Sequence, residues 1–156
     1  MARDPFRPVD DEARAMAQNL VSEARHGALA TTLDGAPFVT RIAVAPCELG
    51  LVTLVSDLAP HTGALRTAPE GSLLIGEPGR GDPLAHPRVT LQVRAAFLEK
   101  TEDHMAAYLS VQPKAKLYIG FGDFHLVRLD VQGGLLNGGF GKAYRLEPSD
   151  LGSLKP

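Results

Sequence analysis

The sequence predicts a mainly β protein with flanking helices, folded as a small antiparallel β-barrel. Six or more short apolar runs alternate with turns rich in Gly, Pro, Asp and Asn, as in strands joined by hairpin-length links. Few segments show the three- and four-residue apolar spacing of an amphipathic helix. A barrel is favoured over an open sheet because closure removes exposed strand edges.

Composition limits the class of protein and its partners. The 156 residues fit one domain, 1–156, with an N-terminal arm at 1–9 and a C-terminal tail at 147–156. A net charge of -2 gives no reason to expect nucleic acid or a membrane as a partner. The charged N-terminus and the single cysteine, Cys47, favour a cytoplasmic location.

The N-terminal half is expected to begin with a helix and to continue as a strand meander. Asp10 or Asp11 can cap the helix, whose apolar residues recur at helical spacing. The dipeptide Asp34-Gly35 predicts a hairpin turn. A short helix is expected at 61–68, closed by Pro69. The expected strands are 28–33, 38–45, 51–55 and 72–75.

The C-terminal half contains the longest expected strand, 89–97, in which polar and apolar side chains alternate. Thr101 or Glu102 starts another helix, which Pro113 interrupts. Gly133-Gly134 predicts a turn. The remaining strands are expected at 124–131, 135–137 and 140–146, the last two forming one strand broken around Gly138-Gly139.

The segment 76–87 holds three glycines and three prolines between two expected strands. It is long for a simple connection, which favours a functional or interface role. Asp82 and Arg88 either bind a substrate or pair with each other to pin the loop, and pinning is preferred. His86 is either an exposed loop residue or a ligand of haem iron.

Several segments resemble the FMN-binding split β-barrel superfamily, the fold of pyridoxamine 5′-phosphate oxidase. They are A-T-T-L-D-G-A-P-F-V-T-R-I-A-V-A (30–45), L-V-T-L-V-S-D, H-T-G-A-L-R-T-A-P-E-G-S-L-L-I and L-Q-V-R-A. Four more are similar to its haem-utilisation branch: S-D-L-A-P-H-T-G-A-L-R, G-D-P-L-A-H-P-R, Y-I-G-F-G-D-F and G-G-F-G-K-A. The resemblance covers about residues 15–146 and implies an antiparallel split β-barrel.

The resemblance also implies a homodimer with FMN at the subunit interface. The flavin-binding residues that it implies are Arg41, Ser56, Asp57, His61, Thr62 and Gln92. By resemblance, Arg41 contacts the flavin phosphate, while His61 and Thr62 open the phosphate-facing helix. Ser56 and Asp57 lie in the loop that meets the flavin, and Gln92 lies near the isoalloxazine edge.

The chemistry of these side chains suits those roles. Arg41 offers a planar fork of donors, and Thr62 with nearby backbone N–H groups would add donors at a helix start. His61 can act as a donor or a switch near neutral pH. The amide of Gln92 can satisfy both donors and acceptors on a flavin ring.

The sequence departs from two relatives at named positions. The oxidase carries lysines where this chain has Ala45 or Pro46, and an Arg-Lys pair where it has Pro60-His61. Each lost charge-assisted bond would cost roughly 1.5–3 kcal/mol of phosphate binding. The arginine and histidine that grip pyridoxal phosphate have no counterpart in 140–156, so pyridoxine oxidation is not expected. Haem-utilisation proteins usually extend further at the C-terminus, so haem degradation is a less favoured prediction for this chain.

The leading prediction is a dimeric, FMN-binding oxidoreductase-like protein that acts on an unknown small molecule. Flavin would supply the redox chemistry, and no catalytic residue is assigned. One alternative is a haem-binding or haem-degrading split-barrel protein with His61 or His86 near the iron. Another is a non-catalytic dimer of the same fold. The other histidines share no metal-ligand spacing, so no metal site is predicted.

Overall fold

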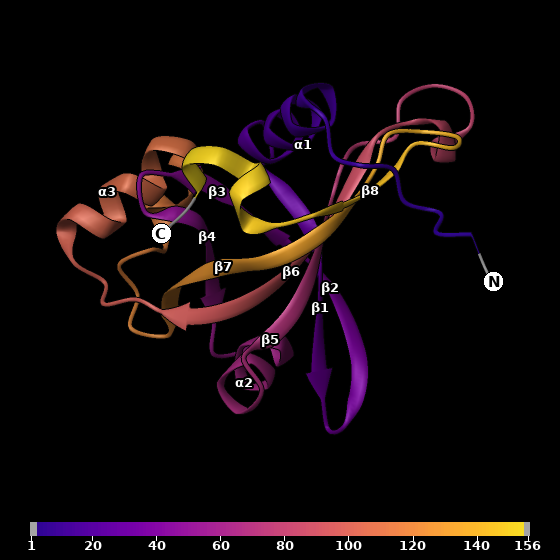
Figure 1. Cartoon of the computed structure of the whole chain (residues 1–156). Coiled ribbons are helices and arrows are strands. Elements are labelled where there is room, and N and C mark those ends of the chain that lie inside the picture. The colour runs from indigo at the N-terminus through magenta and orange to yellow at the C-terminus, as the bar shows by residue number, and fades with distance from the viewer. Residues whose placement is uncertain (1–2, 155–156) are drawn as a thin grey trace.

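A computed structural model describes residues 3–154, which form eight antiparallel strands in one curled sheet with three flanking α-helices (Figure 1). The strands are β1 (His26–Leu33), β2 (Ala36–Ala43), β3 (Ala45–Cys47), β4 (Gly50–Ser56), β5 (Glu70–Ile75), β6 (Arg88–Phe97), β7 (Phe124–Asn137) and β8 (Ala143–Leu146). The helices are α1 (Asp11–Ser22), α2 (Pro60–Thr67) and α3 (Glu102–Val111), with 3-10 turns η1 (Pro83–Ala85), η2 (Pro113–Leu117) and η3 (Pro148–Leu154). This architecture confirms the predicted mainly β, antiparallel split barrel.

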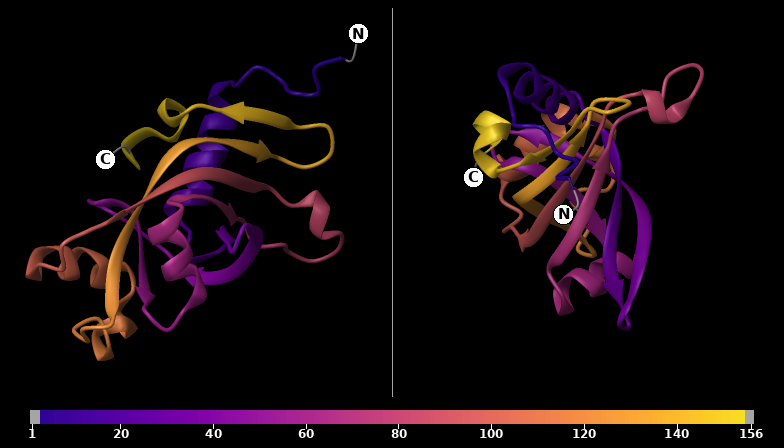
Figure 2. Two further views of the ribbon diagram at one scale, coloured as in Figure 1. Left: turned by 90° about the horizontal axis from the view of Figure 1, so that it is seen from below. Right: turned by 45° about the vertical axis from the view of Figure 1, so that its right-hand side comes forward.

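The sheet curls until its two ends approach each other, as the views in Figure 2 show. Its strand order is β2-β1-β5-β6-β7-β4-β3, and β8 pairs with the end of β7. Within residues 3–154 no ladder joins β2 to β4, so the barrel is split there. The hydroxyl of Thr53 on β4 bridges the gap by donating to the carbonyl oxygen of Ala43 on β2, at 2.7 Å.

Alternation along β6 defines an inner and an outer face. Val89, Leu91 and Val93 are buried in the core, while Gln92 and Arg94 point to the outer face and are exposed. Helix α1 covers part of the inner core with its buried residues Ala13, Ala17 and Val21. The outer face of β6 is therefore left free by the helices that cover the core.

Local signals in the sequence predicted several elements correctly. Asp34 and Gly35 both have positive φ, 52° and 78°, as a two-residue hairpin turn requires. Asp10 caps α1, because its Oδ1 accepts from the backbone N–H of Ala13 at 2.8 Å. Thr101 caps α3 in the same way. The short helix after β4 begins at Pro60, one residue before its predicted start.

Several predicted strand boundaries are wrong, including the start of the strand expected at 140–146, which begins at Ala143. The strand expected at 38–45 ends at Ala43, and the separate strand β3 pairs with β4 instead. Gly133-Gly134 is not a turn, because β7 runs through it and stays paired with Leu91 and Gln92 of β6. A register shift between Gln92 and Val93 accommodates the extra residue on β7. The turn lies at 138–142 instead.

The two terminal segments are tied to the barrel more closely than an arm and a tail imply. Arg7 forms a parallel bridge with Tyr144 of β8. In η3, Leu151 is buried, and Asp150 accepts a hydrogen bond from Arg14 Nε at 3.0 Å. No helix within residues 3–154 is long and apolar enough to cross a membrane.

Candidate functional site

Two adjoining grooves cross the outer face of the sheet. The first groove, of about 470 Å³, lies over β1, β5 and β6 and reaches from Pro37 and Thr32 to Gln92. The second groove, of about 450 Å³, lies over β6, β7 and β8. The residues that line both grooves are Ser72, Gln92 and Gln132. The two grooves therefore meet at the middle of β6, where sequence reasoning placed the flavin-facing Gln92.

One row of residues across the strands underlies the first groove, and most of its side chains are short. The sheet register pairs Ala30 with Ser72, Ser72 with Gln92, and Gln92 with Gly133. The side chains beside Gln92 in this row are short, so its amide is exposed at the groove. A surface of short side chains with one amide and one hydroxyl can hold a planar ring and bond to its edge.

Arg41 lies on the same outer face but outside the lining of either groove. It pairs across the sheet with Ala28, one row beyond the pair of Val39 with Ala30. Its side chain is exposed, and it forms no ion pair with any residue in 3–154. Four residues of extended strand, roughly 14 Å, separate it from Pro37 at the end of the first groove.

His61 and Thr62 hold the start of α2 in place rather than lining the grooves. His61 is buried, and its Nδ1 lies 2.9 Å from Oγ1 of Thr40 on β2. Burial lowers the pKa of His61, so the ring is neutral at physiological pH. The Thr62 hydroxyl donates to the carbonyl oxygen of Ser56 at 2.6 Å. The start of α2 therefore carries no cation, and both of its polar side chains, His61 and Thr62, are already hydrogen-bonded within the chain.

The two faces of β2 also separate these residues from Arg41. Successive side chains on a strand point to opposite faces, so Thr40 and its partner His61 lie behind the strand from Arg41. The predicted set of flavin contacts is thus divided in the structure. Arg41 and Gln92 share the outer face, whereas His61 and Thr62 lie on the other side of β2.

A polar cluster beside the loop after β4 was not predicted. Oδ1 of Asp57 lies 2.8 Å from Nε2 of His125 and 3.7 Å from the Arg66 guanidinium. The hydrogen bond from His125 is the main cause that lowers the pKa of the Asp57 carboxyl. The Arg66 guanidinium also stacks 4.2 Å above the centre of the Phe97 ring. The cluster depends on the pairing of β4 with β7, which no local sequence signal reveals.

Ser56 acts in the turn that starts this loop. Its hydroxyl accepts a hydrogen bond from the backbone N–H of Leu58 at 3.1 Å, as in the side-chain-stabilised turns that serine favours. The backbone N–H of Asp57 donates to the carbonyl oxygen of Asp123 at 2.8 Å. These bonds fix the loop 56–60 against the turn before β7.

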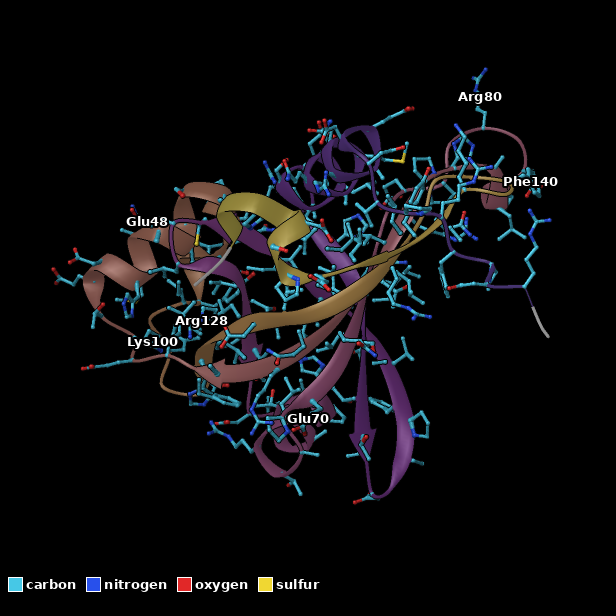
Figure 3. All side chains as sticks on the ribbon, in the orientation of Figure 1. Glu48, Glu70, Arg80, Lys100, Arg128 and Phe140 are labelled. Carbon is cyan, nitrogen blue, oxygen red and sulfur yellow. The ribbon has the colours of Figure 1, made fainter. Side chains whose placement is uncertain are left out.

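The loop 76–87 is pinned, as expected, but not by a pair of Asp82 with Arg88. Asp82 Oδ1 accepts from the backbone N–H of Leu84 at 2.9 Å, and Arg88 Nη1 donates to the carbonyl oxygen of Leu84 at 3.1 Å. His86 Nε2 lies 2.8 Å from the carbonyl oxygen of Arg80. Figure 3 shows Arg80 at the tip of this projecting loop, far from Glu70 at the opposite end of the sheet. His86 lines neither groove.

Solved structures with the same fold resemble this chain over most of its length. No protein-family model and no curated protein matches the chain. One solved structure is 40% identical, with a TM-score of 0.85 over 93% of this chain and 98% of its own. A haem-binding protein from Mycobacterium smegmatis is 31% identical, with a TM-score of 0.81 over 92% of this chain. The chain therefore has the split β-barrel fold that the sequence resemblance implied.

Proteins with this fold differ in what they bind. An FAD-binding protein from Mesorhizobium loti has a TM-score of 0.60 at 17% identity, over 77% of this chain and 90% of its own, and shares the fold alone. This chain spans only 61% of the length of the M. smegmatis haem-binding protein. Split-barrel neighbours thus include both haem-binding and flavin-binding proteins.

Proposed function

We propose that this split-barrel protein binds FMN on the outer face of its sheet and is an oxidoreductase-like protein. The observation that carries the proposal is the row of Ala30, Ser72 and Gln92 in the first groove, where short side chains leave the amide of Gln92 exposed. The amide of Gln92, with that of Gln132 beside it, matches the mixed donors and acceptors along a flavin edge. Bound FMN would supply the electron-transfer chemistry, and the chain's own residues would bind and orient it.

The phosphate of FMN would depend mainly on Arg41. Its guanidinium is exposed on the same face and has no competing carboxylate within residues 3–154. His61 is neutral and Thr62 is bonded to Ser56, so the start of α2 adds little positive potential. Ser56 and Asp57 remain proposed contacts through the loop 56–60, although the carboxylate of Asp57 is already bonded to His125.

A homodimer would complete this site. Three apolar side chains on the outer face are notably exposed: Val39 at 61%, Leu74 at 43% and Leu135 at 45%. They surround the two grooves on β2, β5 and β7. A second copy of the chain packed on this face would bury them and enclose the grooves.

Titration of the purified protein with FMN, followed by quenching of flavin fluorescence, tests the proposal. Wild-type protein should bind FMN, and Gln92→Leu should weaken binding by roughly 5- to 30-fold through loss of a ring-edge hydrogen bond. Arg80→Gln, on the projecting loop, serves as the control and should bind as wild type does. A folded protein that binds no FMN at about 1 mM would overturn the proposal.

Haem binding is the second candidate, and the haem-binding relative at 31% identity favours it. The grooves give it less support, since none of their lining residues within 3–154 is His, Cys, Met or Tyr, the usual axial ligands. His61 Nε2 has no hydrogen-bond partner among the described residues, but His61 lies behind β2. A haemin titration of wild type and of the His61→Ala/His86→Ala double variant tests haem binding. A Soret shift that is absent, or that is the same in the variant, would remove this candidate.

A non-catalytic dimer is the third candidate, and the lack of cations at the start of α2 is its argument. Such a protein would dimerise through the outer face while binding neither FMN nor haemin. Size-exclusion chromatography with light scattering, on wild type and on Val39→Glu, measures dimerisation independently of any cofactor.

A further inference from the structure

The N-terminal arm forms one wall of the second groove. The backbone N–H of Arg7 donates to the carbonyl oxygen of Ala143 at 2.8 Å, which aligns the arm with β8. This alignment places the Phe6 ring against Arg145, whose guanidinium carbon lies 4.6 Å from the ring centre. Both Phe6 and Arg145 line the second groove. Figure 1 shows the arm passing along β8 at this side of the sheet.

The second groove is an amphipathic slot. Leu135 and Phe6 supply apolar surface, while Thr90 and Gln132 supply a hydroxyl and an amide. The groove joins the first groove at Gln92, so a ligand there would lie beside the proposed flavin position.

Arg145 is prepared to bind an anion. Its guanidinium is stacked on Phe6, and it forms no ion pair with any residue in 3–154. Stacking covers one face of a guanidinium and leaves its N–H edge available for a bidentate bond to a carboxylate. Glu147 also lines the groove, and its charge opposes a second negative charge on the ligand. The lining therefore favours a monoanionic carboxylate over a phosphate.

We propose that the second groove binds a planar, conjugated carboxylic acid, with its carboxylate on Arg145 and its ring against Phe6. The lining of the second groove is the argument for binding such an acid, and this part of the proposal does not depend on FMN. Its role as the substrate, presented beside the flavin at Gln92, rests on the proposed FMN-binding function. The substrate class would then be aromatic carboxylic acids, selected by Arg145 and Phe6.

trans-Cinnamate is a suitable probe because it is planar, conjugated and singly charged. Its affinity is measured by isothermal titration calorimetry on the full chain without added flavin. Arg145→Gln should lower the affinity on the order of tenfold or more, since a charge-assisted bond is lost. Phe6→Ala should lower it by about three- to tenfold. Arg80→Gln, an exposed arginine on the projecting loop, should leave the affinity unchanged.

Cinnamamide, which has nearly the same shape without the charge, provides the ligand control. Wild type should bind it about as weakly as Arg145→Gln binds cinnamate. Wild type that fails to bind cinnamate, or Arg145→Gln that is folded by circular dichroism and binds it equally well, overturns the proposal. So does equal affinity of wild type for the acid and the amide.

FMN titrations on the same variants separate this proposal from the flavin proposal. If Arg145→Gln loses cinnamate but keeps FMN, both proposals stand. If wild type binds cinnamate through Arg145 and binds no FMN, the acid site stands and the flavin proposal falls. If FMN binds but cinnamate does not, only the acid site falls.

Discussion

Oγ1 of Thr40 and Nδ1 of His61 lie 2.9 Å apart and join the edge strand β2 to the start of α2. Because burial lowers the pKa of His61, this contact is made by a neutral ring. His61, at the position where the resemblance to the oxidase family implies a cation, therefore docks a helix here. This contact shifts the expected phosphate recognition from the helix start to Arg41.

Folding stability should fall as the pH drops below the ordinary histidine pKa of about 6.5. Below that pH the unfolded chain takes up a proton at His61, whereas the folded chain, with its lowered pKa, does not. Protonation therefore favours unfolding, and the loss levels off below the folded-state pKa. Urea unfolding at about pH 7.5 and about pH 5.5 should show a smaller loss for His61→Gln than for wild type. An unchanged loss in the variant would contradict this account.

Thr53→Val should destabilise the barrel by about 1 kcal/mol. The substitution keeps the shape of the side chain but removes the hydroxyl that donates to the carbonyl oxygen of Ala43 across the split. Thr53→Ser keeps that donor and is the matched control. Urea titrations should rank the free energies of unfolding as wild type, then Ser, then Val. If Val is as stable as wild type, the bridge does not hold β4 to β2.

Two neighbouring glycines on β7 should respond differently to alanine. A Cβ at Gly134 would lie 2.7 Å from the backbone oxygen of Thr90, so Gly134→Ala should cost about 1–3 kcal/mol of stability. A Cβ at Gly133 meets nothing closer than 3.4 Å, so Gly133→Ala should fold normally. That Cβ would lie 3.7 Å from Oε1 of Gln92, within the second groove.

Binding and stability measurements on the two alanine variants separate packing from ligand contact. Gly133→Ala should bind cinnamate more weakly while its melting temperature stays near that of wild type. Gly134→Ala should lower the melting temperature. The reverse ranking of melting temperatures would show that the register of β6 with β7 is misassigned.

Arg41→Gln should weaken FMN binding by roughly 10- to 100-fold and leave riboflavin binding nearly unchanged. Riboflavin has the same ring without the phosphate, so the comparison isolates the proposed contact of the guanidinium. Fluorescence titrations with both ligands give, for FMN and for riboflavin, the ratio of the variant's dissociation constant to that of wild type. An equal loss for FMN and riboflavin would mean that Arg41 acts on the fold or the ring instead.

Sequence reasoning succeeded where the signal is local. The positive φ values at Asp34 and Gly35, and the cap made by Asp10, each depend on residues within one turn of the chain. It failed at Gly133-Gly134, where two glycines read as a turn although the pairing partners on β6 keep the strand continuous. Tertiary pairing overrode the local preference there.

The candidate site shows the same difference between what local signals predict and what long-range pairing decides. Gln92 was predicted as a flavin contact by resemblance to the split-barrel family, and in the structure it lies where both grooves meet. The contacts of Asp57 with His125 and of Phe6 with Arg145 join residues more than sixty positions apart. Only the register of β4 with β7, and of the arm with β8, brings them together.

The visible spectrum of the protein as purified, followed by thermal unfolding with added FMN or haemin, distinguishes FMN binding from haem binding. The purified protein should show flavin absorbance, or should be colourless with a melting temperature that rises with FMN concentration by mass action. The rise should be smaller for Gln92→Leu. A haem Soret band in the purified protein, or a melting temperature that haemin raises and FMN leaves unmoved, would contradict FMN binding.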